Sequence, residues 1–437
     1  MKTILILLVV FAGLFAFVYF YEIQGGKERE EAKEKEEKLV SLERDKVTEI
    51  EVLRKGSEPI VLKKSGNDWS LRKPIETPAD STTVDSLLSA VTSARIDRKL
   101  EQGAKEAAKY GLSDPRVRLV FRGDKVQQDL VLGSNDFTGS QVYVQRQGSP
   151  DVFLTSDYLL TSVDKELKDW RNKKALAFDR DQVQNVEINR GSDQLKLKKQ
   201  GEKWVLEQPI QEAADEGAVS SLLSTLESAE AQTFVTEQPD DLKTYGLQEP
   251  GVTVRIREQG KDSWKTLALG KKEGEDYLAR NTERTPVFTL KAEVFDKLNQ
   301  KLWEFRDKSV VDVEQDRVTE LTLKRADAEI VLKRQDDGKW VVQKPDSLKG
   351  KEAFTYKFWY PLTDIKYQSI DDRPAGAAGS GKTGIQVTVK LKDGSQRHYE
   401  FSQEGDKYLA RKVDAGRVGS ISKESFEALK FKPEDLV

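Results

Sequence analysis

The most constraining feature of this sequence is a long internal repeat. The phrase WSLRKPIETPAD, residues 69–80, returns as WVLEQPIQEAAD at residues 204–215, a shift of 135 residues (204 − 69). A fainter copy, WVVQKP, begins at Trp340, 136 residues further on (340 − 204). Solenoid repeats recur every ~20–50 residues, whereas this period is the length of a whole domain. The sequence therefore predicts tandem copies of one domain.

The match extends well beyond that phrase. KYGLSDP at 109–115 corresponds to TYGLQEP at 244–250, and DWRNK at 169–173 corresponds to EFRDK at 304–308. Matches that stay in register with few gaps indicate duplication rather than chance. They place a first copy at residues 47–182, a second at 183–317 and a divergent third at 318–437.

Each copy combines β patterns with helical ones. TEIEV, PIVLKK and DWSLRK alternate apolar and polar residues between polar turns, which predicts a small antiparallel meander. Asp80 and Asp215 stand directly before apolar helical patterns, the position of an N-cap. The repeated phrase then holds a core tryptophan, a turn proline and a helix start. We expect an α+β fold of tandem modules, each an antiparallel sheet plus helices.

The YGL echo has the pattern of a helix stop. KEAAKY and DDLKTY are predicted to form short helices that end at the tyrosine. Gly111 and Gly246 then suit the left-handed conformation, and the leucine after each is the usual hydrophobic contact. The alternative is that these residues contact a ligand.

The third copy departs in its middle. Its helical segment reads FTYKFWYPLTDI, residues 354–365, with Phe354, Phe358, Trp359 and Leu362 at helical spacing and Pro361 interrupting. Such a stripe favours a core helix, and the alternative is an exposed groove for sugars or a partner helix. The YGL motif is missing and is replaced by DDRPAGAAGSGKTG.

The N-terminus indicates a membrane anchor. Residues 4–21 carry no charge, and 18 residues are just enough to cross a bilayer as a helix. The apolar run exceeds a usual signal-peptide core and no clear cleavage site follows, so an uncleaved anchor at residues 1–21 is favoured over a cleaved signal. Residues 22–46 are rich in Glu and Lys and predict a solvated helical stalk, with disorder as the alternative. The bulk of the chain would then lie in the periplasm or at the cell surface.

Composition excludes several classes of site. The chain has no cysteine, which removes disulfides, thiolate metal sites and cysteine nucleophiles. Lys plus Arg total 72 against 75 Asp plus Glu, a balance that argues against nucleic-acid binding. No cofactor and no metal site is expected.

Two isolated motifs are only weak evidence for a catalytic or nucleotide-binding site. GAAGSGKT, residues 376–383, has the letters of a phosphate-binding loop, but the following residues alternate as a strand, where that motif needs a helix. We therefore predict a loop and no nucleotide. The single histidine, His398, lies in a strand pattern without a matching nucleophile signature, which favours a surface residue.

Repeated charged residues mark the end of each copy. Arg171 and Lys173 follow Trp170, and Arg306 and Lys308 follow Phe305. One interpretation is a joint, with arginine stacked or paired at the edge of the next copy. The other is partner docking, because Arg and aromatic residues are favoured binding anchors. With the aromatic segment of the third copy, the candidate partner-binding residues are Trp170, Arg171, Lys173, Phe305, Arg306, Lys308, Phe358, Trp359 and Tyr360.

The pattern WxLxxPxxxxAD, then SLL, then YGL before proline, then LxLG, resembles the bacterial envelope family called domain of unknown function 4340. Members of that family are often encoded beside components of an ABC transport system, which implies an accessory role. We expect a non-enzymatic, membrane-anchored extracytoplasmic protein, an accessory or scaffold subunit that contacts membrane transporter subunits. The alternatives are a glycan- or peptide-binding envelope module and an envelope hydrolase with an unrecognised site.

Overall fold

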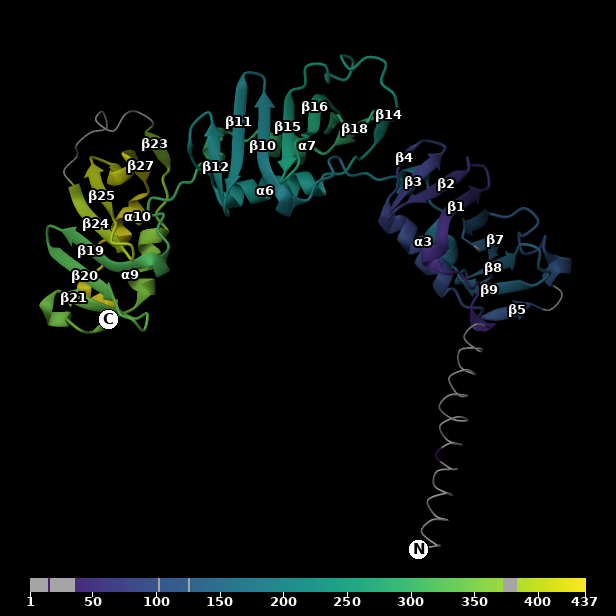
Figure 1. Ribbon diagram of the computed structural model, residues 1–437, viewed down its shortest axis with the longest axis horizontal. Coiled ribbons are helices and arrows are strands. Elements are labelled where there is room, and N and C mark those ends of the chain that lie inside the picture. Colours follow the sequence, from purple (N-terminus) through teal and green to yellow (C-terminus); the bar gives the residue numbers. More distant parts are fainter. Residues whose placement is uncertain (1–14, 16–35, 101–102, 125, 372–382) are drawn as a thin grey trace, which may run out of the picture. The chain divides into compact units, whose positions relative to one another are not determined.

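The computed structural model describes residues 15, 36–100, 103–124, 126–371 and 383–437 (Figure 1). The chain divides into two units, Met1–Lys174 and Ala175–Val437, of which the first holds one module and the second holds two. The predicted anchor and stalk lie outside the described residues, apart from Phe15 and the residues from 36 onward. Among the helices in the described ranges, none is both long and apolar enough to cross a membrane.

The first module is mostly β. Its described strands are β1 (Val47–Arg54), β2 (Ile60–Ser65), β3 (Asp68–Lys73), β4 (Thr77–Pro78), β5 (Arg98–Leu100), β6 (Val117–Gly123), β7 (Val126–Asn135), β8 (Gln141–Arg146) and β9 (Val152–Ser156). Its helices are η2 (Arg44–Lys46), α3 (Ser81–Ser93), η3 (Gly103–Glu106), α4 (Tyr158–Val163) and α5 (Leu167–Trp170). The strands form one antiparallel sheet in the order β4-β3-β2-β1-β6-β7-β8-β9-β5.

The second module repeats this architecture. Its strands are β10 (Val183–Arg190), β11 (Asp193–Gln200), β12 (Lys203–Gln208), β13 (Glu212–Ala213), β14 (Phe234–Thr236), β15 (Val252–Glu258), β16 (Lys265–Glu273), β17 (Asp276–Asn281) and β18 (Val287–Leu290). Its helices are η4 (Arg180–Gln182), α6 (Glu216–Ser228), α7 (Ala292–Leu298) and α8 (Leu302–Phe305). The sheet order, β13-β12-β11-β10-β15-β16-β17-β18-β14, is that of the first module.

The third module keeps the same topology despite its divergent sequence. Its strands are β19 (Val318–Arg325), β20 (Ala328–Arg334), β21 (Trp340–Lys344), β22 (Glu352–Ala353), β23 (Ser369–Asp371), β24 (Thr383–Leu391), β25 (Gln396–Glu404), β26 (Lys407–Lys412) and β27 (Arg417–Ile421). Its helices are η5 (Gln315–Arg317), η6 (Asp346–Leu348), α9 (Thr355–Thr363), η7 (Val413–Ala415), α10 (Lys423–Ala428) and η8 (Pro433–Leu436). The order β22-β21-β20-β19-β24-β25-β26-β27-β23 confirms tandem modules with antiparallel sheets, in which helices are few.

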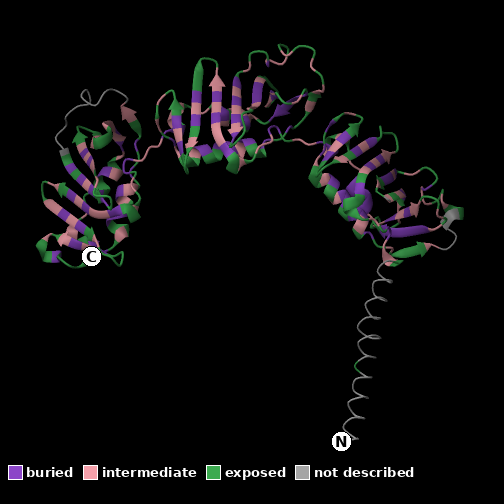
Figure 2. Ribbon diagram, in the orientation of Figure 1, coloured by how far each residue is buried: buried purple, intermediate pink, exposed green. Residues whose placement is uncertain are grey.

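Each module has its own hydrophobic core between the sheet and its helices (Figure 2). The three repeated tryptophans, Trp69, Trp204 and Trp340, belong to these cores and are at most 7% exposed. The X-Pro bonds that follow them, at Pro74, Pro209 and Pro345, are all cis. The sequence-based interpretation of a core tryptophan and a turn proline is thus confirmed in every module.

The helix after the first strands begins as predicted in two modules. The Asp80 carboxylate accepts a hydrogen bond from the Thr83 N–H at 2.7 Å, and the Asp215 carboxylate accepts one from Ala218 N–H at 2.9 Å. Both are N-caps that satisfy a free donor of the first turn. In α9 the corresponding residue is Phe354, whose side chain makes no such bond.

The YGL segments cover the other face of the sheet in the first two modules. Gly111 and Gly246 adopt positive φ values of 71° and 68°, as predicted for a stop signal. The carbonyl of each preceding tyrosine is hydrogen-bonded to the sheet. Ser134 N–H donates to the Tyr110 carbonyl at 2.9 Å, and Lys271 N–H donates to the Tyr245 carbonyl at 3.0 Å.

The predicted short helices before these glycines are wrong. The 3-10 helix η3 ends at Glu106, and residues 107–111 and 242–246 form turns. Helix nucleation is unfavourable for a segment of a few residues, and these segments keep only local turn bonds, such as those from Leu112 N–H to the Ala107 carbonyl and from Leu247 N–H to the Leu242 carbonyl.

The modules begin earlier than the sequence boundaries suggest. Leu39, Ala175 and Val310 are fully buried in the first, second and third cores respectively, each ahead of its module's first strand. Their N–H groups donate to backbone carbonyls just beyond the helices α3, α6 and α9, at 2.8, 2.9 and 3.1 Å. We call residues 39–46, 175–182 and 310–317 the leading segments. The last two were assigned by sequence to the end of the preceding module.

Candidate functional site at the joint of the second and third modules

Each module is closed by a residue from its own C-terminal segment. Trp170, Phe305 and Leu436 are fully buried, and their carbonyls accept hydrogen bonds from Asp80, Asp215 and Phe354 N–H at 2.8, 2.9 and 2.8 Å; we call them the closing residues. Isolated β-bridges pair Ala79 with Arg171 and Ala214 with Arg306. The two phrases that repeat most clearly in the sequence therefore meet in space.

This placement weighs against direct docking of a partner by four of the candidate residues. Trp170 and Phe305 have no accessible surface, and Arg171 and Arg306 are only 3% and 6% exposed. Side chains this deeply buried offer a partner almost no surface for direct contact. Burial favours the other interpretation, in which these residues form a joint between copies.

Lys173 and Lys308 remain partly accessible. The Lys173 ammonium lies 3.6 Å from the Asp169 carboxylate, with its side chain 35% exposed. The Lys308 ammonium lies 5.3 Å from the centre of the Trp303 ring and donates to the Glu304 carbonyl at 3.2 Å. Their role in partner binding stays a prediction.

Arg306 is held by a carboxylate of its own module. Its Nε donates to Oε1 of Glu212 at 2.6 Å, and its Nη2 donates to Oε2 at 3.1 Å. This two-point contact is the geometry in which arginine and carboxylate pair most specifically. Glu212 lies in the short edge strand β13, and its side chain is only 11% exposed. Arg306 therefore pairs within its own module, and its predicted pairing at the edge of the next copy stays a prediction.

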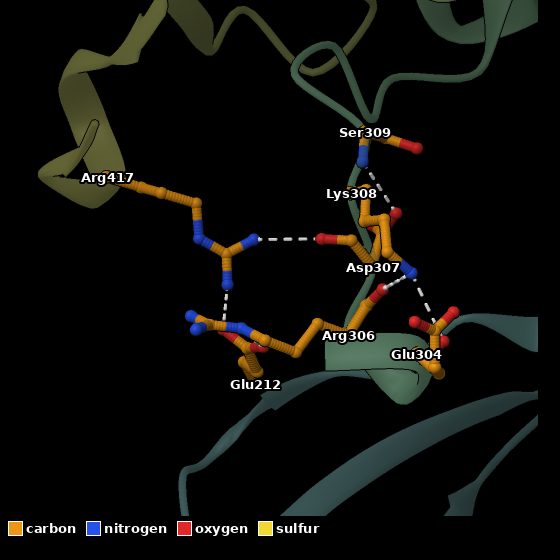
Figure 3. A network of polar contacts seen from close by, with 7 residues as sticks. All are labelled: Glu212, Glu304, Arg306, Asp307, Lys308, Ser309 and Arg417. Carbon is orange, nitrogen blue, oxygen red and sulfur yellow. Dashed lines mark hydrogen bonds and ion pairs between the residues drawn. The ribbon is translucent and has the colours of Figure 1, made fainter. Parts of the chain in front are cut away.

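A second arginine, from the third module, also binds Glu212 (Figure 3). Arg417, at the start of β27, donates from Nη2 to Oε2 of the same Glu212 carboxylate, and its Nη1 donates to the Asp307 carbonyl at 3.3 Å. The Arg417 side chain is 16% exposed. We call Glu212, Arg306 and Arg417 the joint cluster. Because little water reaches it, its ion pairs are screened less than surface pairs.

The link between these modules is ordered at every residue. Asp307 N–H donates to the Ala213 carbonyl at 3.1 Å, and Ser309 N–H donates to the Asp307 carboxylate at 2.9 Å. The Lys308 carbonyl accepts from Tyr367 N–H at 2.7 Å. The link is therefore bonded to the second module at its start and to the third module at its end.

Two members of the joint cluster, Glu212 and Arg417, are not part of the repeat. Thr77 in β4 occupies the position that Glu212 has in β13, and the register of β17 with β18 places Pro286 at the position that Arg417 has at the start of β27. No sequence echo could therefore have found Glu212 or Arg417. Of the three residues in the joint cluster, the repeat in the sequence marked only Arg306.

Leading segments are held by a polar side chain at one recurring sheet position. Arg146 Nε donates to the Leu39 carbonyl at 2.7 Å, and Asn281 Nδ2 donates to the Ala175 carbonyl at 3.0 Å. In the third module the equivalent Lys412 pairs with Asp312 at 2.9 Å. The polar residue ties the start of each module to its sheet.

Glu258 adds a second attachment in the second module. It is 4% exposed, accepts from Asp179 N–H at 2.9 Å, and pairs with Lys261 and Lys265 at 2.8 and 2.9 Å. Burial alone would raise its pKa, but the hydrogen bonds from Lys261, Asp179 and Lys265 outweigh it and lower the pKa to about 2. Glu258 is therefore ionised whenever the module is folded near neutral pH.

The aromatic stripe of the third module divides between two faces of α9. Phe358 and Trp359 are 1% and 4% exposed, so their predicted role in binding is not supported by their placement. Tyr360 is 55% exposed, and so it remains available to a partner. Phe354, which the helical spacing assigned to the core, is 47% exposed.

The described residues form no catalytic site around either of the two weak catalytic motifs. Thr383 begins β24, so the chain continues as a strand after the glycine-rich segment, whose residues 376–382 lie outside the described ranges. His398 is half-exposed, and its Nδ1 lies 3.2 Å from Asp414 Oδ1. A hydrogen bond from the His398 N–H, with others from its ring, lowers the pKa of Asp414. Within the described residues no cluster of His, Cys, Asp and Glu could hold a metal ion.

Comparison with known proteins identifies one family. The family model described as "Domain of unknown function (DUF4340)" matches residues 69–213 and 204–378, together more than half of the chain. The two matches begin at Trp69 and Trp204, the same residues that open the repeated phrase. No curated protein matches the chain.

Proposed function

Because the chain belongs to the family called domain of unknown function 4340, whose description assigns no activity, we propose its function from the way its modules are joined. The chain is a non-enzymatic, membrane-anchored extracytoplasmic scaffold. It serves as an accessory subunit of an ABC-type envelope transport system and contacts the membrane subunits of that system.

The observation that carries this proposal is the joint. One carboxylate, Glu212, binds a guanidinium from its own module and another from the next, and the link between the modules is hydrogen-bonded throughout. The second and third modules accordingly form one unit, Ala175–Val437. A fixed relation between modules suits a protein that holds binding surfaces at a set separation, because preorganised surfaces lose less entropy on binding.

The sequence supports an extracytoplasmic location. The uncharged residues 4–21 support an uncleaved helix in the cytoplasmic membrane, and residues 22–46 support a stalk. The modules then lie in the periplasm or at the cell surface. The transporter partner follows from the genetic neighbourhood that is typical of the family.

Crosslinking in the native membrane tests the proposal. The intact protein is crosslinked, purified and analysed by mass spectrometry, with a variant lacking residues 1–21 as the control. We expect transporter permease and ATPase subunits in stoichiometric yield with the intact chain, and their loss with the truncated one. Recovery of the intact protein without any transporter subunit, or with cell-wall material alone, would overturn the accessory role.

A further inference from the structure

The first module exposes two aromatic side chains at one end of its sheet. Phe137 is 99% exposed and Tyr158 is 57% exposed, and in the described part of this module no other large hydrophobic side chain is exposed. Phe137 lies in the link between β7 and β8, and Tyr158 begins α4. The Asp157 N–H donates to the Ser140 carbonyl at 3.0 Å, so the two segments that carry the rings are bonded to each other. We call Phe137 and Tyr158 the aromatic tips.

The turn that carries Phe137 is held by its own hydrogen bonds. The Asp136 carboxylate accepts from the Gln141 N–H at 3.1 Å and from the Thr138 hydroxyl at 2.8 Å. Gly139 takes a positive φ of 77°, and its N–H donates to the Asp136 carbonyl at 3.1 Å. Because these polar groups are bonded inside the turn, the turn can enter a less polar environment at a lower cost.

The aromatic tips are not part of the repeated fold. Residues 136–140 link β7 to β8, whereas the links from β16 to β17 and from β25 to β26 are the tight turns 274–275 and 405–406. The registers of β8 with β9, of β17 with β18 and of β26 with β27 align Tyr158 with Glu293 and Glu424. Two modules thus fold without an aromatic residue at either position. Exposed aromatic rings without a folding role mark an interaction surface.

The chain reaches the first module beside these tips. The Ile96 N–H donates to the carbonyl of Glu37 in the entering segment at 2.7 Å. The next residue, Asp97, accepts from the Gln141 side-chain amide at 2.9 Å, and Gln141 closes the turn of Phe137. The entry point of the chain and the Phe137 turn are therefore at the same end of the module.

The sequence before this entry point selects what the tips contact. Residues 4–21 are the predicted membrane anchor, and residues 22–36 separate it from Glu37. Even fully extended, that separation reaches only about 50 Å, so the bilayer lies within one tether length of the module. A tether makes a second contact with the bilayer intramolecular, at an effective concentration in the millimolar range. A contact that is weak by itself is then populated.

A bilayer surface suits the tips better than a protein surface does. Two aromatic side chains offer at most ~400 Å², whereas a stable protein interface buries about 800 Å² per partner. A protruding ring needs no complementary pocket in lipid, and aromatic side chains are favoured at the headgroup level. The charged residues at this end have both signs, as with Arg95, Asp97 and Asp157. The rings therefore supply the attraction, and anionic headgroups are not required.

We propose that the aromatic tips of the first module insert their rings into the headgroup region of the membrane that holds the N-terminal anchor. This rests on the proposed membrane anchor and adds a second point of contact with the same bilayer. The ring of Phe137 enters from its rigid turn, and the ring of Tyr158 enters beside it from the start of α4. The first module is then held at two points, which limits its orientation against the membrane surface.

Photocrosslinking in the native membrane tests the proposal. The photoreactive amino acid p-benzoylphenylalanine replaces Phe137 in the full-length chain, and the adducts formed on irradiation are identified by mass spectrometry. The matched site is Tyr360, a tyrosine of the third module that is 55% exposed. We expect phospholipid adducts at residue 137 in at least about tenfold higher yield than at residue 360, because burying one such ring shifts an equilibrium by at least about tenfold.

A second variant separates ring insertion from mere closeness to the membrane. Tyr158→Glu introduces the residue that the second and third modules have at this position, so it is compatible with the fold. It should lower the yield of lipid adducts at residue 137 by about fivefold, because one of the two inserted rings is lost. The control, Tyr360→Glu, removes a similarly exposed tyrosine and should leave that yield unchanged.

Four outcomes would overturn the proposal. They are protein adducts without lipid at residue 137, no lipid adduct while the chain stays in the membrane fraction, equal lipid yields at residues 137 and 360, and equal yields with and without Tyr158→Glu. A chain that is absent from the membrane fraction would refute the anchor itself and this contact with it. A lack of transporter subunits in the purified complex would refute the accessory role and leave the lipid adducts unaffected, so the two proposals fail separately.

Discussion

Replacement of Arg417 by alanine should loosen the joint without unfolding either module. The change removes a charge-assisted hydrogen bond to Glu212 and a longer bond to the Asp307 carbonyl. Hydrogen bonds to charged groups contribute ~1.5–3 kcal/mol. Since Glu212 keeps its two-point contact with Arg306, no carboxylate is left unpaired, and we expect a loss of about 2 kcal/mol. That free energy corresponds to a roughly 30-fold increase in the open joint.

Hydrogen exchange measures this opening directly. The Tyr367 amide, which donates to the Lys308 carbonyl of the link at 2.7 Å, exchanges when the link is released from the third module, so its protection in Arg417→Ala should fall by about the same factor. Glu212→Thr, which introduces the residue of the first module, removes the buried carboxylate that Arg306 and Arg417 share and should lower protection further. The control is Lys339→Ala, which breaks a solvent-exposed pair with Glu352 at 3.2 Å and should leave the link unchanged. Protection within twofold of wild type in Arg417→Ala would refute the role of the joint cluster.

Three further changes test the packing of the modules. Glu258→Gln should destabilise the second module by about 3 kcal/mol near pH 7, since the pKa of Glu258 falls from its ordinary 4.5 to about 2 on folding. Because the pKa of Glu258 is lower in the folded state, this contribution to stability is present above pH 4.5 and is lost as the pH falls towards 2. Urea unfolding of wild type and variant measures it at each pH. A difference in unfolding free energy that does not shrink with acid would contradict the prediction. Gly270→Ala places a methyl group against the Tyr245 carbonyl and should destabilise the YGL segment by ~1–3 kcal/mol. Gly217→Ala in α6, which faces only a side-chain oxygen at 3.2 Å, should be neutral or stabilising in the same thermal unfolding assay.

The repeated residues were predictable because local chemistry determines them. An aspartate before an apolar helical pattern caps the helix wherever it occurs, and a glycine before leucine ends a turn in the left-handed conformation. Asp80, Asp215, Gly111 and Gly246 accordingly behave as expected. Gly270 was also visible as a repeated letter, but its reason was not, because the approach of the Tyr245 carbonyl is a long-range contact.

The joint was only half predictable. Arg306 stood out because it echoes Arg171, yet its partner Glu212 lies 94 residues away, and the third member, Arg417, is 205 residues from Glu212. Neither partner belongs to the repeat, so no periodicity could reveal them. On α9, helical spacing found the buried residues Phe358 and Trp359 but gave no means of separating them from the exposed Tyr356 and Tyr360. Alignment with α3 and α6 does separate them, since Val84 and Val219 mark the buried face.

The sequence alone also does not determine at which residue each repeating unit begins. Any cyclic starting point describes a tandem repeat equally well, and the family match runs from Trp69 in β3 to Ala213 in β13, across the end of one module and into the next. Packing selects the physical unit, because Leu39 and Trp170 lie in one core whereas Ala175 and Phe305 lie in the next. On this division the residues between a closing residue and the next leading segment, 171–174 and 306–309, are the joints. The charged echoes DWRNK and EFRDK therefore fall at the module ends, where one core is complete and the next begins, and their arginines are buried because they finish a fold.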